Sequence, residues 1–269
     1  MSMMKSAFCI LLLIPALCFS APGDVDLKWI SPDSESIRYV GRFSEDFGSE
    51  WSGSSLSIRF TGPVLIAHLQ SQQPVGVELI LNGESRFLLV KPDQTRYVLA
   101  DDLNGKGMHE ATLFRRSEAA YGTIHFLGAE VAENSRLEPI PEKPRKILFI
   151  GDSITCAYAN ETLDRDQGNT PENQNGYLSY AAIAARRLNA DLHMICWSGR
   201  GLHRNRMLKF EQHETLPKIF DRTLPSQSRN KWDHERFVPD VVVINLGTND
   251  ATDRGGQKEA LDKEGYIRT

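Results

Sequence analysis

Three short clusters rich in glycine and polar residues each follow an apolar run in the second half of the chain. They read Gly151-Asp152-Ser153-Ile154-Thr155, Trp197-Ser198-Gly199-Arg200-Gly201 and Gly247-Thr248-Asn249-Asp250. A serine hydroxyl attacks a carbonyl carbon when a base accepts its proton, and the tetrahedral intermediate then needs hydrogen-bond donors for its oxyanion. The backbone amides of Ser153 and Gly199 and the side-chain amide of Asn249 are suitable donors. The clusters together therefore predict acyl-transfer chemistry.

Each cluster also has an ordinary structural explanation. A serine after a strand commonly caps the N-terminus of a helix. A glycine there commonly forms a turn, and an asparagine commonly closes an Asx-turn. The catalytic interpretation is favoured because all three clusters occur in this order and each stands at the end of a predicted strand.

The elements that must position these clusters have the pattern of an α/β domain. The apolar run at 146–150 predicts a strand buried on both faces. The runs at 190–197 and 241–246 predict a second strand and a third strand, of which the third is expected to be buried. The segment 177–188 has helical spacing and four alanines, which favour helix. In a parallel sheet of this kind, active sites lie beyond the carboxyl ends of the strands, where the clusters stand.

The first half has a different pattern, in which short runs alternate apolar and polar residues and turn residues separate them. Such alternation predicts strands with one buried face, and Asn82-Gly83 between two runs predicts a tight hairpin. We expect a β-sandwich over residues 24–136, a proline-rich linker outside both cores over 137–145 and the α/β domain over 146–269. The predicted strands of the sandwich are 57–60, 64–69, 77–81, 87–90, 96–99, 111–114 and 123–131.

Composition narrows the classes of partner. The chain has 269 residues, 41% hydrophobic and 25% charged, with a formal net charge of −4. A binder of nucleic acid needs an excess of clustered Lys and Arg, so we expect no nucleic-acid partner. Residues 1–20 resemble a secretory signal peptide, with Lys5 before an apolar run and Ser20-Ala21 at the expected cleavage point. The mature protein is therefore expected to be secreted or periplasmic and free of the membrane, with Cys156 and Cys196 as small buried side chains.

The three clusters resemble blocks I, II and III of the GDSL or SGNH hydrolases. Gly151 to Cys156, Asn175-Gly176-Tyr177, Asp221 to Pro225 and Pro239 to Asp250 are further similar to carbohydrate esterase family two, which carries a jelly-roll domain before its SGNH domain. The resemblance implies a jelly roll followed by a flavodoxin-like three-layer α/β/α domain. It also implies removal of acetyl groups from polysaccharides such as xylan or mannan, with Ser153 as the nucleophile and Gly199 and Asn249 as oxyanion donors. It implies no metal and no organic cofactor.

The catalytic histidine is not assigned by this resemblance, because the family's histidine follows block III at a distance. The histidines of the chain are His68, His109, His125, His193, His203, His213 and His234. Among them only His203 stands near a strand-end cluster. We therefore expect the chain to hold only strands one, two and three of the flavodoxin-like order 2-1-3-4-5, to be a piece of a longer esterase incomplete at its C-terminus, and to be inactive as written.

Two alternatives remain open from the sequence. One is another SGNH enzyme, such as a lipase, although the polar segment 160–175 suits a sugar better than a lipid. The other is a carbohydrate-binding protein that reuses the fold without catalysis. Absence of the catalytic base favours this second alternative, whereas retention of all three clusters opposes it.

Overall fold

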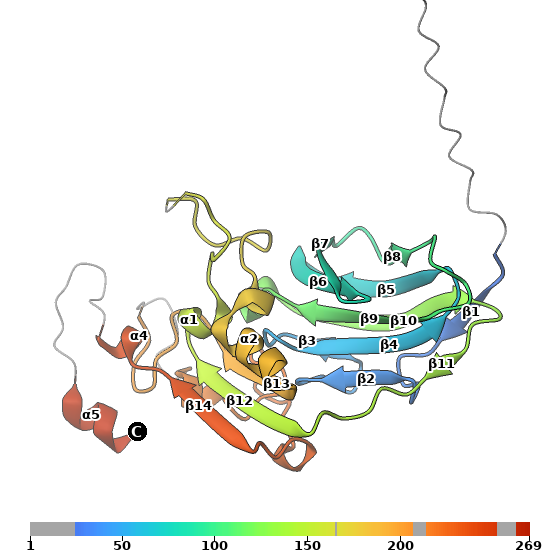
Figure 1. Ribbon diagram of the computed structural model, residues 1–269. Coiled ribbons are helices and arrows are strands. Elements are labelled where there is room, and N and C mark those ends of the chain that lie inside the picture. The colour runs from blue at the N-terminus through green and yellow to red at the C-terminus, as the bar shows by residue number, and fades with distance from the viewer. Residues whose placement is uncertain (1–24, 165, 207–213, 252–261) are drawn as a thin grey trace, which may run out of the picture.

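The computed structural model describes residues 25–164, 166–206, 214–251 and 262–269. The predicted signal segment 1–20 and His213 lie outside these ranges. A β-sandwich and an α/β region follow one another along the chain and lie side by side (Figure 1). This arrangement confirms the predicted fold class of a sandwich followed by an α/β domain.

The sandwich consists of two antiparallel sheets. The first has the order β1-β10-β5-β8, with β3 paired to β10, and the second has the order β11-β4-β9-β6-β7, with β2 paired to β4. The strands of the first sheet are β1 (Leu27–Ile30), β3 (Gly48–Ser49), β5 (Leu65–Ser71), β8 (Arg96–Ala100) and β10 (Ile124–Ala132). Those of the second are β2 (Ile37–Val40), β4 (Ser55–Thr61), β6 (Val75–Leu81), β7 (Glu84–Val90), β9 (Met108–Arg115) and β11 (Leu137–Glu138). A 3-10 turn, η1 (Ala119–Tyr121), precedes β10.

Alternation along the strands explains how the sandwich closes over its core. In β4, Leu56, Ile58 and Phe60 are buried, whereas the residues between them are only partly covered. Successive side chains of a strand point to opposite faces, so these three enter the space between the sheets. The core cluster that contains them is built entirely from sandwich residues.

The predicted hairpin is present between β6 and β7. Asn82 and Gly83 both have positive φ, 53° and 89°, and Leu81 pairs with Glu84 across the turn. Two central residues with positive φ are the requirement of a type I′ turn, which matches the twist of the two strands. The sequence prediction at this point is confirmed.

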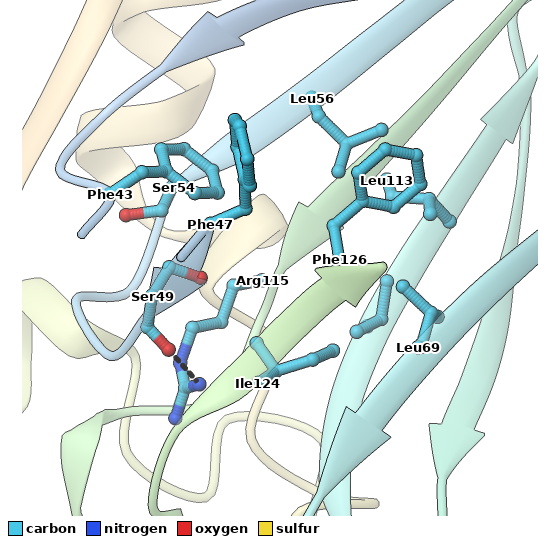
Figure 2. A pocket seen from close by; sticks show the side chains of 11 residues that line it. Phe43, Phe47, Ser49, Ser54, Leu56, Leu69, Leu113, Arg115, Ile124 and Phe126 are labelled. Atoms are coloured by element: carbon cyan, nitrogen blue, oxygen red, sulfur yellow. Dashed lines mark hydrogen bonds between the residues drawn. The ribbon is translucent and has the colours of Figure 1, made fainter. Parts of the chain in front are cut away.

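A gap in the sandwich interior is shown in Figure 2. It is lined mainly by apolar side chains, among them Phe43, Phe47 and Phe126, with the Arg115 guanidinium at one end. Its volume of about 20 Å³ is room for about one water molecule. We interpret it as a packing gap of the core and not as a ligand site.

Two parts of the sequence prediction for the first half need correction. The strands β1, β2 and β3 were not predicted. The predicted connector is not outside both cores, since Leu137 pairs with Phe60 of β4 and packs against the sandwich core. Proline removes a backbone donor only from Pro139 onward, so the two residues before it can still join the sheet.

The α/β region is built on a parallel sheet with the order β13-β12-β14. This is the 2-1-3 order predicted for the first three strands. The strands are β12 (Arg145–Gly151), β13 (Ala190–Cys196) and β14 (Val241–Asn245). The helices are α1 (Ser153–Cys156), η2 (Gly176–Leu178), α2 (Tyr180–Arg187), α3 (Leu216–Ile219), η3 (His234–Arg236), α4 (Thr248–Ala251) and α5 (Lys263–Arg268).

The long helix begins later than predicted. The expected range was 177–188, but Ser179 is extended and its hydroxyl accepts a hydrogen bond of 3.1 Å from the Ala182 amide. This is an N-cap, and a cap residue stands outside the helix that it starts. The helix α2 therefore begins at Tyr180, and residues 176–178 form a separate 3-10 turn.

The three strands of this sheet differ in burial. Every residue of β13 is buried. The strand β14 was predicted to be buried, but within the described residues it forms the outer edge of the sheet, and Val241 and Ile244 are 50% and 65% exposed. Figure 1 shows β14 on the side of β12 that faces away from the sandwich.

The apolar cores of the α/β region include residues from the sandwich. Phe114 of β9 belongs to the cluster around Ile147 and Met194, and Trp51 belongs to the cluster around Ile195 and Leu216. Cys156 and Cys196 are buried and free, as predicted. Within the described residues, no helix is long and apolar enough to cross a membrane.

Candidate active site

The three strand-end clusters lie together at the carboxyl ends of the strands of the α/β sheet. Gly151, the last residue of β12, pairs with Cys196 of β13 and with Asn245 of β14. The residues that follow these three positions are therefore neighbours across the sheet. Open parallel sheets bind their ligands beyond these carboxyl ends of the strands.

Ser153 begins the single-turn helix α1. Asp152 caps this turn, because its Oδ1 accepts a hydrogen bond of 3.0 Å from the Ile154 amide. The turn ends at Ala157, which has a φ of 60°. The four residues of α1 align few peptide dipoles, so its positive end, near Ser153, is weaker than that of a full helix. Ser153 is half-buried, and its hydroxyl makes no hydrogen bond within the described part of the chain.

Gly151 is required by the tightness of this turn. A Cβ atom at this position would lie 1.9 Å from the Thr155 hydroxyl oxygen. Thr155 is buried, and its hydroxyl lies 2.9 Å from the Tyr180 hydroxyl of α2. The turn that carries Ser153 is thus packed against α2.

Gly199 lies in the loop after β13 with a φ of 78°, a conformation that favours glycine. Its carbonyl oxygen accepts a hydrogen bond of 2.9 Å from the Arg206 amide. Gly201 also has no room for a side chain, because a Cβ there would lie 1.9 Å from the Arg204 carbonyl oxygen. The second cluster therefore begins a compact loop whose two glycines are needed for different reasons.

Asn249 connects all three clusters. It is buried at the start of α4, and its side-chain Nδ2 donates to Asp152 Oδ2 at 3.2 Å and to the Arg200 carbonyl oxygen at 2.8 Å. Asp152 immediately precedes Ser153, and Arg200 immediately follows Gly199. The structure thus brings Ser153, Gly199 and Asn249 close together. The two hydrogen bonds that join their clusters use both hydrogens of the Asn249 side-chain amide.

Asp250 fixes the loop after β13, a role that sequence reasoning missed. Its buried carboxylate accepts hydrogen bonds from three consecutive backbone amides, those of Leu202, His203 and Arg204, at 2.9, 2.7 and 2.9 Å. The Arg204 side chain in turn donates to the Asp250 carbonyl oxygen at 2.7 Å. The signal was the position of Asp250 directly after Asn249 in the third cluster.

Burial also affects the acid next to the candidate nucleophile. The pKa of the Asp152 carboxyl is raised, primarily because burial disfavours its charge, and the negative charge of Asp250 adds to this effect. The backbone amides of Ile154 and Asp152 act in the opposite direction. The Asp152 carboxylate accepts hydrogen bonds from the Ile154 amide in the Ser153 turn and from the Asn249 side chain.

The side chains of the described histidines contact residues other than Ser153. His68, His109 and His125 are on strands of the sandwich. His193 is buried in β13 with its ring stacked on Phe237, and the exposed His234 lies 3.0 Å from Asp221. The His203 backbone is bound to Asp250, but its ring faces Asp262 at 3.2 Å. No histidine of the described ranges is hydrogen-bonded to Ser153.

The polar segment 160–175 was interpreted as a sugar-facing surface, and three of its side chains, those of Glu161, Asn169 and Gln174, bind the sandwich. Arg116, which is buried, pairs with Glu78 at 2.8 Å and with Glu161 of this segment. Its Nε donates to the Gln174 carbonyl oxygen at 2.8 Å. Asn169 donates to the Glu118 carboxylate at 3.3 Å. The segment therefore forms part of a polar interface between the sandwich and the α/β region.

Comparison with known proteins identifies both regions. Residues 39–141 match the carbohydrate esterase 2 N-terminal family, and residues 149–268 match the GDSL-like lipase/acylhydrolase family. An acetylxylan esterase / glucomannan deacetylase of Cellvibrio japonicus is 30% identical over 92% of this chain and 72% of that protein. The chain belongs to family two of the carbohydrate esterases. The resemblance found in the sequence is therefore confirmed.

Two further relatives place the chain within this family. The cellulase/esterase CelE of Acetivibrio thermocellus is 40% identical over 81% of this chain, which spans only 27% of that protein. The structure of a family two carbohydrate esterase from Clostridium thermocellum in complex with cellohexaose has a TM-score of 0.78 and is 37% identical. The match covers 86% of this chain and 70% of that one.

Proposed function

We propose that this protein is an exported serine esterase that removes O-acetyl groups from carbohydrates such as plant-cell-wall xylan or mannan. The observation that carries the proposal is the position of Asn249, hydrogen-bonded to the residue before Ser153 and the residue after Gly199. Such a cluster at the end of a parallel sheet suits attack on an ester carbonyl. The names of the relatives, which include acetylxylan esterase and glucomannan deacetylase, favour acetylated polysaccharides as substrates.

In this mechanism the Ser153 hydroxyl attacks the acetyl carbonyl carbon and the sugar hydroxyl leaves. Water then hydrolyses the acetyl-enzyme to acetate. The Ser153 and Gly199 amides and the Asn249 side chain donate to the oxyanion, for which Asn249 must share or exchange its 3.2 Å bond to Asp152. We assign the base to none of the described histidines.

Replacement of Ser153 tests the proposal. In the protein expressed from its own gene, Ser153→Ala should abolish acetate release from acetylated xylan and glucomannan, because no other described group is placed as the nucleophile. Acetate release is measured directly, together with hydrolysis of p-nitrophenyl acetate. Ser85→Ala, at an exposed position of β7, is the matched serine control and should keep full activity.

Two results would count against this function. Retention of wild-type turnover by Ser153→Ala would exclude Ser153 as the nucleophile. A wild-type protein that binds acetylated oligosaccharides but releases no acetate would favour a carbohydrate-binding protein without catalysis.

A further inference from the structure

A buried carboxylate of the sandwich reaches into the strand-end site. Glu118 stands just before η1 and is 2% exposed. Its Oε2 accepts a hydrogen bond of 2.7 Å from the backbone amide of Ser198, the residue before Gly199. Its Oε1 accepts one of 3.3 Å from the Asn169 side chain. One side chain of the first region thus holds the loop after β13 in the second.

The backbone of Glu118 is itself held on both sides. Its amide donates to the Gln174 side-chain oxygen at 3.2 Å, and its carbonyl oxygen accepts from Arg115 Nη2 at 2.9 Å. The Arg115 guanidinium is buried at the end of the sandwich interior, where Figure 2 shows its bond to Ser49. A side chain anchored in this way can set the orientation of a partner with little freedom.

The burial of this carboxylate has a cost for the fold. Burial raises the pKa of Glu118, while hydrogen bonds from Ser198 and Cys156 and the positive charge of Arg115 act to lower it. The charged form is thus disfavoured in the folded protein despite these partners. Groups of this kind occur more often at functional sites than where packing alone is needed.

We propose that Glu118 is a positioning residue of the active site, which orients the peptide before Gly199 so that the Gly199 amide points to the oxyanion. The inference rests on the proposed function, in which that amide is a donor. Because Ser198 and Gly199 are adjacent, fixing the Ser198 amide restricts rotation of the next peptide plane. The sandwich then contributes to catalysis through the Glu118–Ser198 hydrogen bond.

The test compares three variants of Glu118 with a control variant at the same interface between the sandwich and the α/β region. Glu118→Gln keeps the size of the side chain but offers a single acceptor, so either Ser198 or Asn169 loses its partner. Glu118→Asp keeps the charge but is shorter, and Glu118→Ala removes the group. Glu78→Gln is the matched control, because Glu78 is also a buried sandwich carboxylate but binds Arg116 and not the strand-end loop.

In the protein expressed from its own gene, kcat for p-nitrophenyl acetate should fall about ten- to a hundredfold in Glu118→Ala, which removes the acceptor of the Ser198 amide, at nearly constant KM. Glu118→Asp should recover part of that loss. Hydrogen exchange of the Ser198 amide, measured by mass spectrometry on the 197–201 segment, should become faster in Glu118→Ala and not in Glu78→Gln. Glu78→Gln should lower the melting temperature but keep kcat.

The results distinguish this inference from the proposed function. Wild-type kcat in Glu118→Ala, or an equal loss of kcat in Glu78→Gln, would overturn the positioning role. Unchanged exchange at Ser198 in Glu118→Gln and Glu118→Ala would overturn the hydrogen bond on which it depends. If Ser153→Ala kept wild-type activity while both Glu118 tests gave the expected results, the proposed nucleophile would fail and the positioning role would stand.

Discussion

The sandwich and the α/β region bury their apolar side chains in different ways. The main core of the sandwich is formed by its own two sheets, from Ile30 to Val131. Both apolar clusters of the α/β region include a sandwich residue, Phe114 in one and Trp51 in the other. The first region is therefore self-contained, whereas the second depends on the first for part of its core.

The polar contacts between the regions show the same dependence. The Trp51 indole donates to the Arg222 carbonyl oxygen at 3.1 Å, and Arg42 donates to the same oxygen at 2.9 Å. Glu50 accepts a hydrogen bond of 2.9 Å from the Ser226 amide. In each case a sandwich side chain binds the backbone of the α/β region. The sandwich thus supports loops that have few regular elements of their own.

The largest expected effect concerns Trp51, which is 1% exposed. Trp51→Ala should lower the free energy of unfolding by about 3–5 kcal/mol, because it leaves a cavity beside Ile195 and Leu216 and removes one of the two hydrogen bonds to the Arg222 carbonyl oxygen. Trp29→Ala is the matched control, since Trp29 is 53% exposed and should cost less than about 1 kcal/mol. Urea unfolding measures both. Equal losses in the two variants would contradict the dependence described above.

A smaller effect should appear when the pH is lowered. Burial, followed by the positive charges of Arg42, Arg236 and Lys146, lowers the pKa of His193 to about 3. In the unfolded chain a His side chain has a pKa of about 6.5. As the pH falls from about 6.5 toward 3, the unfolded chain binds a proton at His193 and the folded protein does not, so the folded protein loses stability. At pH 5 the loss is about 2 kcal/mol, from about 1.4 kcal/mol per pH unit.

The variant His193→Phe should remove this part of the pH dependence, because Phe does not titrate and can still stack on Phe237. Urea unfolding at pH 7 and pH 5 measures it. The wild type should lose about 2 kcal/mol more than the variant between the two values. Parallel losses in both proteins would show that His193 does not control the acid sensitivity of the α/β region.

The smallest expected effect is in the self-contained region. Gly83→Ala should cost about 1 kcal/mol, because its φ of 89° strains any residue with a Cβ, although nothing lies near enough to clash. Gly105→Ala is the control, since Gly105 does not have positive φ and its added Cβ would meet only Pro63 at 3.8 Å. Thermal unfolding should separate the two variants, and a change of similar size in both would contradict the turn assignment.

The sequence predicted the features that local pattern determines. Alternation located the longer sandwich strands, Asn82-Gly83 located a hairpin, and the apolar runs before Gly151 and Gly247 located two parallel strands. It could not predict β3 or β11, since two residues carry no period. The start of α2 was missed because Ser179 continues the helical spacing although its side chain caps the helix.

The candidate site was predicted from residue types, but the contacts that hold it were not. Ser153, Gly199 and Asn249 stand in recognisable clusters at strand ends. Glu118 lies 80 residues before Ser198 in a stretch that reads as an ordinary turn. Its role depends on how the two regions pack, and neither spacing nor composition encodes that packing. Asp250 was recognised as part of a cluster, yet its three amide partners became visible only in the folded loop.

The two buried thiols of the α/β region make its opening directly observable. Burial raises the pKa of Cys156 well above its usual value, so the sulfur stays in the unreactive thiol form. A chromogenic disulfide reagent can therefore reach Cys156 and Cys196 only when the strand ends separate from α1. The rate of colour development at a given urea concentration would measure how often the α/β region opens. The sandwich would give no signal, because residues 24–136 contain no cysteine.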